Sequence, residues 1–489
     1  MRQHVSGVWM SAIVLTFVLG TAPVFAEVQN VRVGGDLTVR GMWRDSLRFQ
    51  DDTSTGVGTG TGNEAAAPAG GSSQDAFIQA LLGLNVSADL TDNVSVDTRL
   101  INQRLWGGHG DTAANASTTA TSASSNVNVA LAYVTLKELF YSPLTVKVGR
   151  QNLWYGRGMI VGSRLLASDG DPGQTIAADE FTDDRGFDAI RATLDFNPAT
   201  VDLLWSKVTE NAVNAGDDVN LSGLNLGYRF PSYNAEAEFY FFNKRNADLN
   251  PLNLGSGPFN DKASVSTLGF RGSVEPVSHL TLFGELAYQF GKRDASANAL
   301  GPNADSESAR GDAHRAWMAN LGADYVWADV QWTPRFGAEW IFYSGGDGSD
   351  TAVGGWDAMF RGKFSTLIRE FQSIGAYLPS QSSATGFNAL TNALTNQHSL
   401  QLRAGAKPLE DVDVGTAWTV FWADKGIHPV DGMDAKRYLG TEWDSQLLYD
   451  YTEDVQLGLI YGVLWPGHVF RDQWDSTAQE LITSVKVSF

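Results

Sequence analysis

The chain has no cysteine and an excess of acidic over basic residues, and both features exclude whole classes of protein. Without cysteine there is no disulfide scaffold, no Cys-ligated zinc or iron–sulfur site and no thiol nucleophile. The 55 acidic side chains outnumber the 35 basic ones, which gives a formal charge of −20. Because nucleic-acid binding requires a basic face that contacts phosphates, no nucleic-acid partner is expected.

Long hydrophobic runs are also missing, except at the N-terminus. A membrane-spanning helix requires about 20 consecutive apolar residues, and no segment after the N-terminal one approaches that length. Residues 1–26 have the pattern of a signal peptide, in which Arg2 precedes an apolar stretch over 8–19 and small residues surround a cleavage site after Ala26. We therefore expect export, with residues 27–489 as the mature chain.

In the rest of the sequence, apolar and polar residues alternate within segments about ten residues long. In residues 280–290 the even positions are apolar or aromatic apart from one glycine, whereas the odd positions include Thr281, Glu285 and Gln289. A period of two indicates a β-strand with one apolar and one polar face. About ten residues is the length of a tilted strand that crosses a bilayer. Such strands suit either a soluble sheet or a barrel with lipid outside and water inside.

Three further features favour an outer-membrane barrel. Short connections alternate with long ones, as do the periplasmic turns and outer loops of such barrels. Aromatic residues such as Trp106, Trp205 and Tyr325 gather at segment ends, as in aromatic girdles. The last segment, 481–489, alternates and ends in Phe489, the form of the signal used by the barrel-assembly machinery. The long connections are 46–75, 107–126, 153–186, 292–313 and 344–397, and the short ones include 91–93, 197–199, 231–234, 328–329 and 452–454.

The sequence therefore predicts an all-β fold, a transmembrane antiparallel β-barrel of about 18 strands that forms a single domain over 27–489. An even number suits a closed bacterial barrel, and this size leaves an aqueous channel. Both ends of the mature chain would lie on the periplasmic side. The predicted strands begin near residues 30, 77, 94, 127, 144, 187, 201, 221, 235, 265, 280, 315, 330, 400, 412, 442, 455 and 481.

The polar faces of these strands carry the charged residues that would line the pore. One interpretation is a ladder of charge pairs that keeps the wall wetted; the other is a ring of one sign that sets ion preference. We expect Arg99, Arg191 and Arg403 to act most strongly on a passing ion, because they lie mid-strand and far from bulk water. The predicted pore-lining and selectivity residues are Arg40, Arg99, Lys147, Arg191, Arg271, Glu285, Arg335, Glu339, Arg403 and Asp444.

Two long connections look like inserts with a role of their own. The connection over 153–186 is rich in Asp, Gly and Arg. In 344–397, apolar residues from Phe360 to Phe371 recur at helical spacing and predict a short amphipathic helix. Long loops with internal structure are usually functional, so this one either folds inward as a constriction or covers the mouth as a cap.

Signals for catalysis and for metal binding are weak. The acidic motifs at 169–171 and 347–350 lack the full oxygen set of a calcium loop. No nucleophile elbow of the form Gly-x-Ser-x-Gly occurs. We expect no cofactor, no metal and no enzymatic activity.

Three stretches resemble the alginate export family of outer-membrane barrels. They are VKVGRQNLWYG at 146–156, RGFDAIR at 185–191, and 440–468, which starts with GTEWD and ends with WPGH. The resemblance implies a monomeric, porin-like barrel of about 18 strands and, for the exporters in the family, a cation-lined pore that passes a polyanionic polysaccharide. This chain differs, because its predicted lumen is nearly balanced in sign. By alternation Arg150 and Asp188 would face lipid, unless a bulge near a neighbouring glycine turns them inward.

The residues and the resemblance together predict an outer-membrane channel for a hydrophilic solute or an anionic polysaccharide. Its expected contacts are outer-membrane lipid, the barrel-assembly machinery and the transported molecule. The alternatives are an outer-membrane hydrolase and a surface adhesin built on a barrel. A hydrolase would need a nucleophile–base pair on adjacent strands, and the sequence offers none.

Overall fold

The structure is a computed structural model that describes most of the chain. The described residues are 29–47, 74–106, 127–164, 181–210, 218–246, 263–293, 312–345, 352–371, 395–427, 434–470 and 476–489. The predicted signal peptide, the connection at 107–126, and the acidic motifs at 169–171 and 347–350 lie outside the described residues.

Nineteen strands of the described chain form one sheet, in which β14 (Ala352–Val353) has only two residues and the other strands form the wall. The wall strands are β1 (Gln29–Asp45), β2 (Gln74–Thr91), β3 (Val94–Leu105), β4 (Val127–Leu136), β5 (Leu144–Gln151), β6 (Phe187–Asp195), β7 (Ala199–Thr209), β8 (Val219–Phe230), β9 (Ala235–Asn246), β10 (Ala263–Val277), β11 (Leu280–Arg293), β12 (Asp312–Val326), β13 (Arg335–Tyr343), β15 (Gln397–Leu409), β16 (Val412–Ile427), β17 (Lys436–Asp450), β18 (Val455–Pro466) and β19 (Ala478–Ser488).

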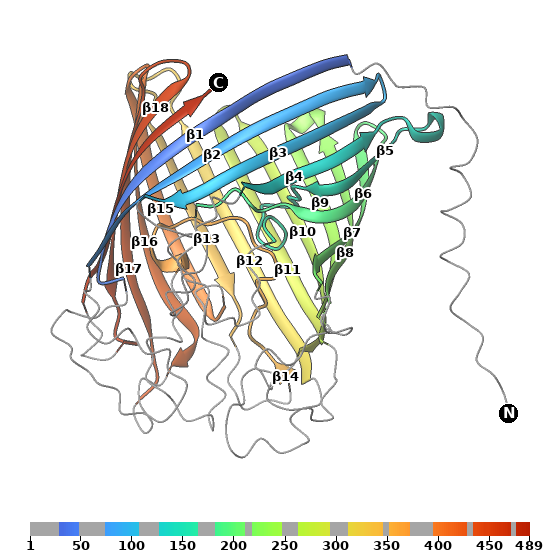
Figure 1. The fold of residues 1–489 in the computed structure, drawn as a ribbon. Coiled ribbons are helices and arrows are strands. Elements are labelled where there is room, and N and C mark those ends of the chain that lie inside the picture. The colour runs from blue at the N-terminus through green and yellow to red at the C-terminus, as the bar shows by residue number, and fades with distance from the viewer. Residues whose placement is uncertain are drawn as a thin grey trace, which may run out of the picture.

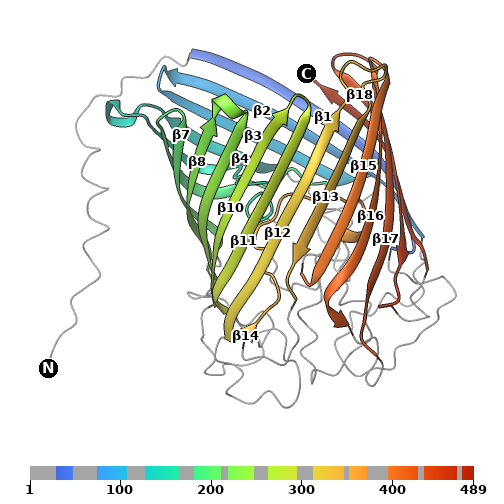
Figure 2. The same cartoon turned by 180° about the vertical axis from the view of Figure 1, so that it is seen from behind.

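The sheet closes on itself because β1 pairs antiparallel with both β2 and β19 (Figure 1). Every wall strand pairs antiparallel with its neighbours, and Figure 2 shows the same tilted strands from behind. A closed barrel pairs all backbone polar groups within the wall, which the hydrocarbon core of a membrane requires. The predicted antiparallel barrel of 18 strands is confirmed. Among the described residues, no helix has the length and hydrophobicity to cross a membrane.

The two faces of the wall differ as the alternation predicts. On β12, Ala316 and Met318 are buried and face the interior. Trp317, which lies between them, is 56% exposed, and Leu321 further along the strand is 50% exposed. The outward positions of other strands likewise carry large exposed apolar side chains. This outward face is suited to lipid, and the opposite face defines the lumen.

Two local predictions are wrong. The strand expected from residue 330 begins at Arg335, because residues 327–334 form a turn in which Trp332 and Thr333 have positive φ angles. Pro334 next to them has no N–H to offer a neighbouring strand.

The second wrong prediction is the amphipathic helix expected from residue 360. Residues 352–371 have little regular secondary structure beyond β14, and their helical part is a single 3-10 turn, η5 (Arg369–Phe371). An amphipathic helix needs a polar face in water, but here the polar Arg361 and Glu370 are buried together with Phe360 and Ile368. The side chains from 354 to 370 are buried or half-buried, so a helix here would have no polar face fully in water.

Candidate channel constriction

Two segments of the chain lie inside the barrel. We call residues 152–164 the inner loop and residues 352–371 the strap. The inner loop follows β5, and the strap lies between β13 and β15. In both views they are found, in teal and orange, within the outline of the wall (Figures 1 and 2).

The strap contacts inward-facing residues of strands far apart around the barrel. Its Asp357 carboxylate lies 3.6 Å from the ammonium of Lys244 on β9. The backbone N–H groups of Ile368 and Arg369 donate to the two carboxylate oxygens of Glu442 on β17, at 2.6 and 2.9 Å. A segment that reaches both β9 and β17 from within must cross the lumen.

The inner loop crosses the same space from the opposite side. Its Gly156 N–H donates to Glu238 on β9 at 3.1 Å, and its Arg157 N–H donates to Glu285 on β11 at 2.7 Å. The loop folds back through Gly156 and Gly158, which have φ angles of +57° and +74°. Residues other than glycine rarely adopt such backbone angles. A Cβ on Gly158 would also lie 2.2 Å from the ring of Trp154.

The two segments meet in the interior. Val161 and Phe360 pair as a parallel bridge, and the Gly162 N–H donates to the Phe360 carbonyl at 2.7 Å. A Cβ on Gly162 would lie 2.8 Å from the Cα of Gly362, so the backbones cross where neither residue has a side chain. Their apolar residues join inward-facing residues of the wall in one buried cluster. Together they narrow the channel.

Glu339 on β13 is the charged centre of this constriction. Its carboxylate accepts from Arg157 of the inner loop at 3.3 Å, from Lys363 of the strap, and from Arg403 of β15 at 2.6 Å. Asn320 on β12 adds a fourth hydrogen bond at 2.9 Å. The Glu339 side chain is 1% exposed. One carboxylate therefore ties two interior segments to the wall.

Burial changes the electrostatics of the cations that the strap brings into the lumen. Loss of water lowers the pKa of the Lys363 ammonium, although Glu339 opposes this shift. The same cause lowers the pKa of Arg369 to about 10. The Arg369 guanidinium lies 5.9 Å from the ring centre of Phe421 and has no hydrogen-bond partner in the described part of the chain.

The three arginines expected to act most strongly on ions lie on β3, β6 and β15, and each is paired with carboxylates. Arg99 contacts Asp36 at 2.8 Å and Asp183 at 2.6 Å. Arg191 makes two hydrogen bonds to Asp202, at 3.0 and 2.7 Å.

Arg403 shares Glu339 and also contacts Asp324 at 2.8 Å. The positive charges of these three arginines are therefore largely balanced by the carboxylates next to them.

Two more predicted pore residues are paired in the same way. Arg271 contacts Glu236 and, at 2.8 Å, Glu238. Arg335 makes a bidentate pair with Asp413 at 2.8 and 2.5 Å.

The other four predicted residues have different surroundings. Glu285 accepts from Tyr240 at 2.6 Å, and Asp444 lies opposite Gly462, where the strap packs. Arg40 lies 3.4 Å from the amide oxygen of Gln79. The Lys147 ammonium lies 4.8 Å from the ring centre of Tyr133.

Arg150 and Asp188 stand on the outer face, the side that simple alternation predicts. They share that face with the exposed Val148 and Ile190, and they form a bidentate pair at 2.8 Å. Although Gly149 has a φ of +123°, the register of β5 with β6 continues without a shift. This pair therefore does not contribute to the pore.

Sequence reasoning missed the cations of the two interior segments. Arg157, Arg361 and Lys363 lie in connections without a strand period, so alternation could not assign them a side. The available signal was glycine next to each of them, at 156, 158 and 362, because glycine allows backbones to approach closely.

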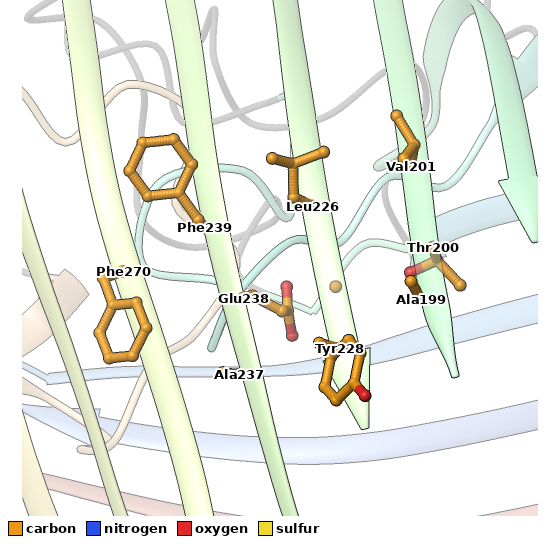
Figure 3. A pocket seen from close by; sticks show the side chains of 10 residues that line it. Ala199, Thr200, Val201, Leu226, Tyr228, Ala237, Glu238, Phe239 and Phe270 are labelled. Carbon is orange, nitrogen blue, oxygen red and sulfur yellow. The ribbon is translucent and has the colours of Figure 1, made fainter. Parts of the chain in front are cut away.

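A depression between β7, β8, β9 and β10 lies in the wall and not in the solute path (Figure 3). Leu226, Tyr228, Phe239 and Phe270 line it, and all four are exposed side chains of the outward face. The depression therefore belongs to the outer surface of the wall.

Comparisons with known proteins agree with this geometry. The model of the family described as alginate export matches residues 33–484. No curated protein matches the sequence.

Among solved structures, OccAB1 of Acinetobacter baumannii is 10% identical, with 95% of this chain and 99% of that chain covered and a TM-score of 0.53. OpdQ of Pseudomonas aeruginosa is also 10% identical, with the same coverage and a TM-score of 0.52. A BenF-like porin from Pseudomonas fluorescens Pf-5 is 14% identical, with 94% and 100% covered and a TM-score of 0.50. These similarities show the shared fold.

The family match covers nearly the whole described barrel, and the fold is that of solved outer-membrane porins. This chain belongs to the alginate export family and is an outer-membrane channel.

Proposed function

We propose that this channel passes small hydrophilic solutes, anions included, and that the inner loop and the strap set the upper size limit. The observation that supports this most directly is the meeting of the two segments at Val161 and Phe360 inside the barrel. An open barrel of 18 strands is wide enough for an aqueous channel, so a constriction built from two crossing segments selects chiefly by size.

The charges of the wall support size selection over strong selection by sign. Cations such as Arg99, Arg191 and Arg335 each lie within 3 Å of a carboxylate. A ladder of close pairs keeps the lumen wetted but produces only a weak net field along the path. Solutes with hydroxyl or carboxylate groups can exchange hydrogen bonds with such a wall.

A polyanionic polysaccharide is the second candidate, favoured by the family match over residues 33–484. For a polymer to pass, the strap would have to detach from β17, where the Glu442 carboxylate accepts hydrogen bonds from two backbone N–H groups of the strap. Transport of a long uronate chain by the wild-type protein would favour this candidate, because the strap would then have to move aside during transport.

Swelling of liposomes that contain the purified barrel tests the size limit. We expect fast entry of monosaccharides and steeply slower entry as the sugar grows. Replacing 352–394 by a short Gly-Ser linker should raise the limit, whereas removing 294–311 from another long connection is the matched control. Equal rates for mono- and hexasaccharides in the wild type would contradict the proposal.

Several further properties belong to the same proposal. Residues 1–26 would be removed on export, and residues 27–489 would form one monomeric domain without enzymatic activity. Phe489 would be recognised by the barrel-assembly machinery. Lipid would contact the exposed apolar face of the wall.

A further inference from the structure

Three cations stand close together on the outward face of the barrel, near the end of the wall that carries the long connections. They are Arg245 on β9, Lys292 on β11 and Arg315 on β12. Register places Arg245 opposite Ser264 of β10, and Ser264 opposite Lys292. Arg315 is paired with Phe290, two residues before Lys292 on β11.

The side to which they point follows from their neighbours. Lys244 precedes Arg245 and is 4% exposed, and His314 and Ala316 flank Arg315 and are 1% and 0% exposed. These neighbours are directed into the barrel, whereas all three cations are exposed. Because successive side chains of a strand point to opposite faces, the three cations point away from the lumen.

Two other outward cations toward the same end of the wall are paired, but these three are not. Arg150 on β5 pairs with Asp188, and Lys207 on β7 pairs with Asp218 at 3.0 Å. In the described part of the chain, Arg245, Lys292 and Arg315 have no ion pair. The outward positions between them carry the neutral polar residues Asn243, Ser264 and Ser266, which hydrogen-bond to one another.

Their spacing would allow the three to hold one ligand. Neighbouring strands lie about 4.8 Å apart, so Arg245 and Lys292 are separated by about 10 Å across β10. Lys292 and Arg315 are diagonal neighbours, about 7–8 Å apart. Their long side chains can converge over Ser264, whose position between them leaves room for an anion.

An aromatic cluster fixes their depth in the membrane. The cluster lies next to the cations, toward the centre of the membrane, and consists of Phe241, Tyr288, Phe290 and Trp317. The ring centres of Phe241 and Phe290 are 6.5 Å apart, and those of Tyr288 and Trp317 are 4.4 Å apart. Amphipathic rings favour the boundary between headgroups and hydrocarbon. The cations beyond them are therefore at the level of the headgroups in the outer leaflet.

We propose that Arg245, Lys292 and Arg315 form a binding site for the phosphorylated headgroup of an outer-leaflet lipid. Guanidinium groups bind phosphate through paired hydrogen bonds, and the lysine adds a compact charge. The acyl chains of the same lipid would lie along the cluster of Phe241, Tyr288, Phe290 and Trp317. The site lies outside the lumen, so it is independent of the proposed solute path.

Lipid binding by the purified barrel in nonionic detergent tests the site, with diphosphorylated lipid A and its dephosphorylated form as probes. Native mass spectrometry at increasing lipid concentration gives the dissociation constants. We expect the wild type to bind the phosphorylated lipid at least tenfold more tightly. The variant Arg245→Ser, Lys292→Ser, Arg315→Ser should lose this preference, whereas Arg245→Lys with Arg315→Lys should keep most of it.

The matched control is the variant Arg32→Ser, Lys137→Ser, Lys407→Ser, which loses the same charge at the periplasmic end and should bind like the wild type. Single serine variants of Arg245 and Arg315, each a few-fold weaker, replace the triple variant if it fails to assemble. Equal affinity for the two probes would overturn the proposal, as would an equal loss in the control. Competition by free pyrophosphate at the concentration of the lipid would also overturn it, since the site would then be one for soluble anions.

Discussion

Val161 of the inner loop and Phe360 of the strap pair as a parallel bridge in the interior of the barrel. Eight of the 18 wall strands, β6 to β13, lie between the two residues along the chain, and neither residue lies in a spanning strand. Their contact joins the inner loop and the strap into one constriction. A change in either segment should therefore alter the width of the channel.

Replacing Gly162 by alanine should widen the constriction. The new Cβ would lie 2.8 Å from Gly362 Cα and 2.9 Å from its nitrogen, and both are backbone atoms that cannot rotate away. We expect the strap to shift and the single-channel conductance in planar bilayers to rise.

Gly272→Ala is the matched control, because a Cβ there meets its nearest atoms at 3.7–3.8 Å and fits without movement. Both variants should still switch on heating from a compact to a slow-migrating form on detergent gels. A Gly162→Ala channel with the conductance of the wild type would show that the crossing does not limit flow.

Replacing Glu339 by glutamine should shift ion preference toward anions. The carboxylate balances Arg157, Lys363 and Arg403, and the amide would leave three cations around the constriction without it. A charge there acts through a lower effective dielectric than one at the mouth. Reversal potential under a salt gradient measures the shift, and Glu210→Gln, which removes a charge on the outside, should leave it unchanged.

Replacing Glu442 by glutamine should loosen the strap. Each carboxylate oxygen accepts one backbone N–H, from Ile368 and from Arg369, whereas an amide has one oxygen and a donor in place of the other. Leaving a buried N–H unpaired costs about 1–3 kcal/mol. We expect more frequent open–closed flicker and faster proteolysis at the strap; unchanged flicker would mean that Glu442 is not an anchor.

Deleting Phe489 should impair assembly of the barrel. The Phe489 backbone closes the seam, donating to the Gly35 carbonyl at 2.9 Å and accepting from the Gly35 N–H at 2.7 Å. Its side chain is 67% exposed and thus available for recognition. We expect the shortened chain to be exported but to remain unassembled, measured as the heat-modifiable fraction in outer membranes. Normal levels of that fraction would contradict the role of the terminal residue.

Strand alternation predicted the wall strands, because lipid and water impose opposite polarity on their successive side chains. The loop lengths, the aromatic residues at segment ends and the last segment were needed to favour a barrel over a soluble sheet. Where the wall turns, the same pattern is misleading. Trp332 follows the apolar alternation that leads into β13, but it lies in a turn with φ of +70° that the sequence pattern does not reveal. Aromatic residues at the membrane boundary are favoured in turns as well as in strands.

The constriction could be predicted only in part. Wall residues such as Glu339 and Arg403 follow the strand period and were therefore assigned to the lumen. Arg157 contacts Glu339 across 182 positions of sequence, and the contact depends on how a connection folds back through the barrel. No local period encodes such a path. The apolar spacing around Phe360 was real, but it serves burial against both the wall and the inner loop.

Replacing Arg99, Arg191 and Arg403 together by glutamine should move ion preference from anions toward cations. Each arginine neutralises carboxylates that would remain after the substitution, among them Asp36 and Asp202. At mid-membrane those carboxylates would act on passing ions with less screening than charges at the mouth.

The triple variant and the wild type are compared by reversal potential under the same salt gradient. Glutamine keeps hydrogen-bond donors at each position, so the wall should stay intact and heat modifiability should not change. The shift should shrink as the salt concentration rises, because screening weakens the fixed field. If the two reversal potentials agree within error at low salt, these arginines do not set ion preference.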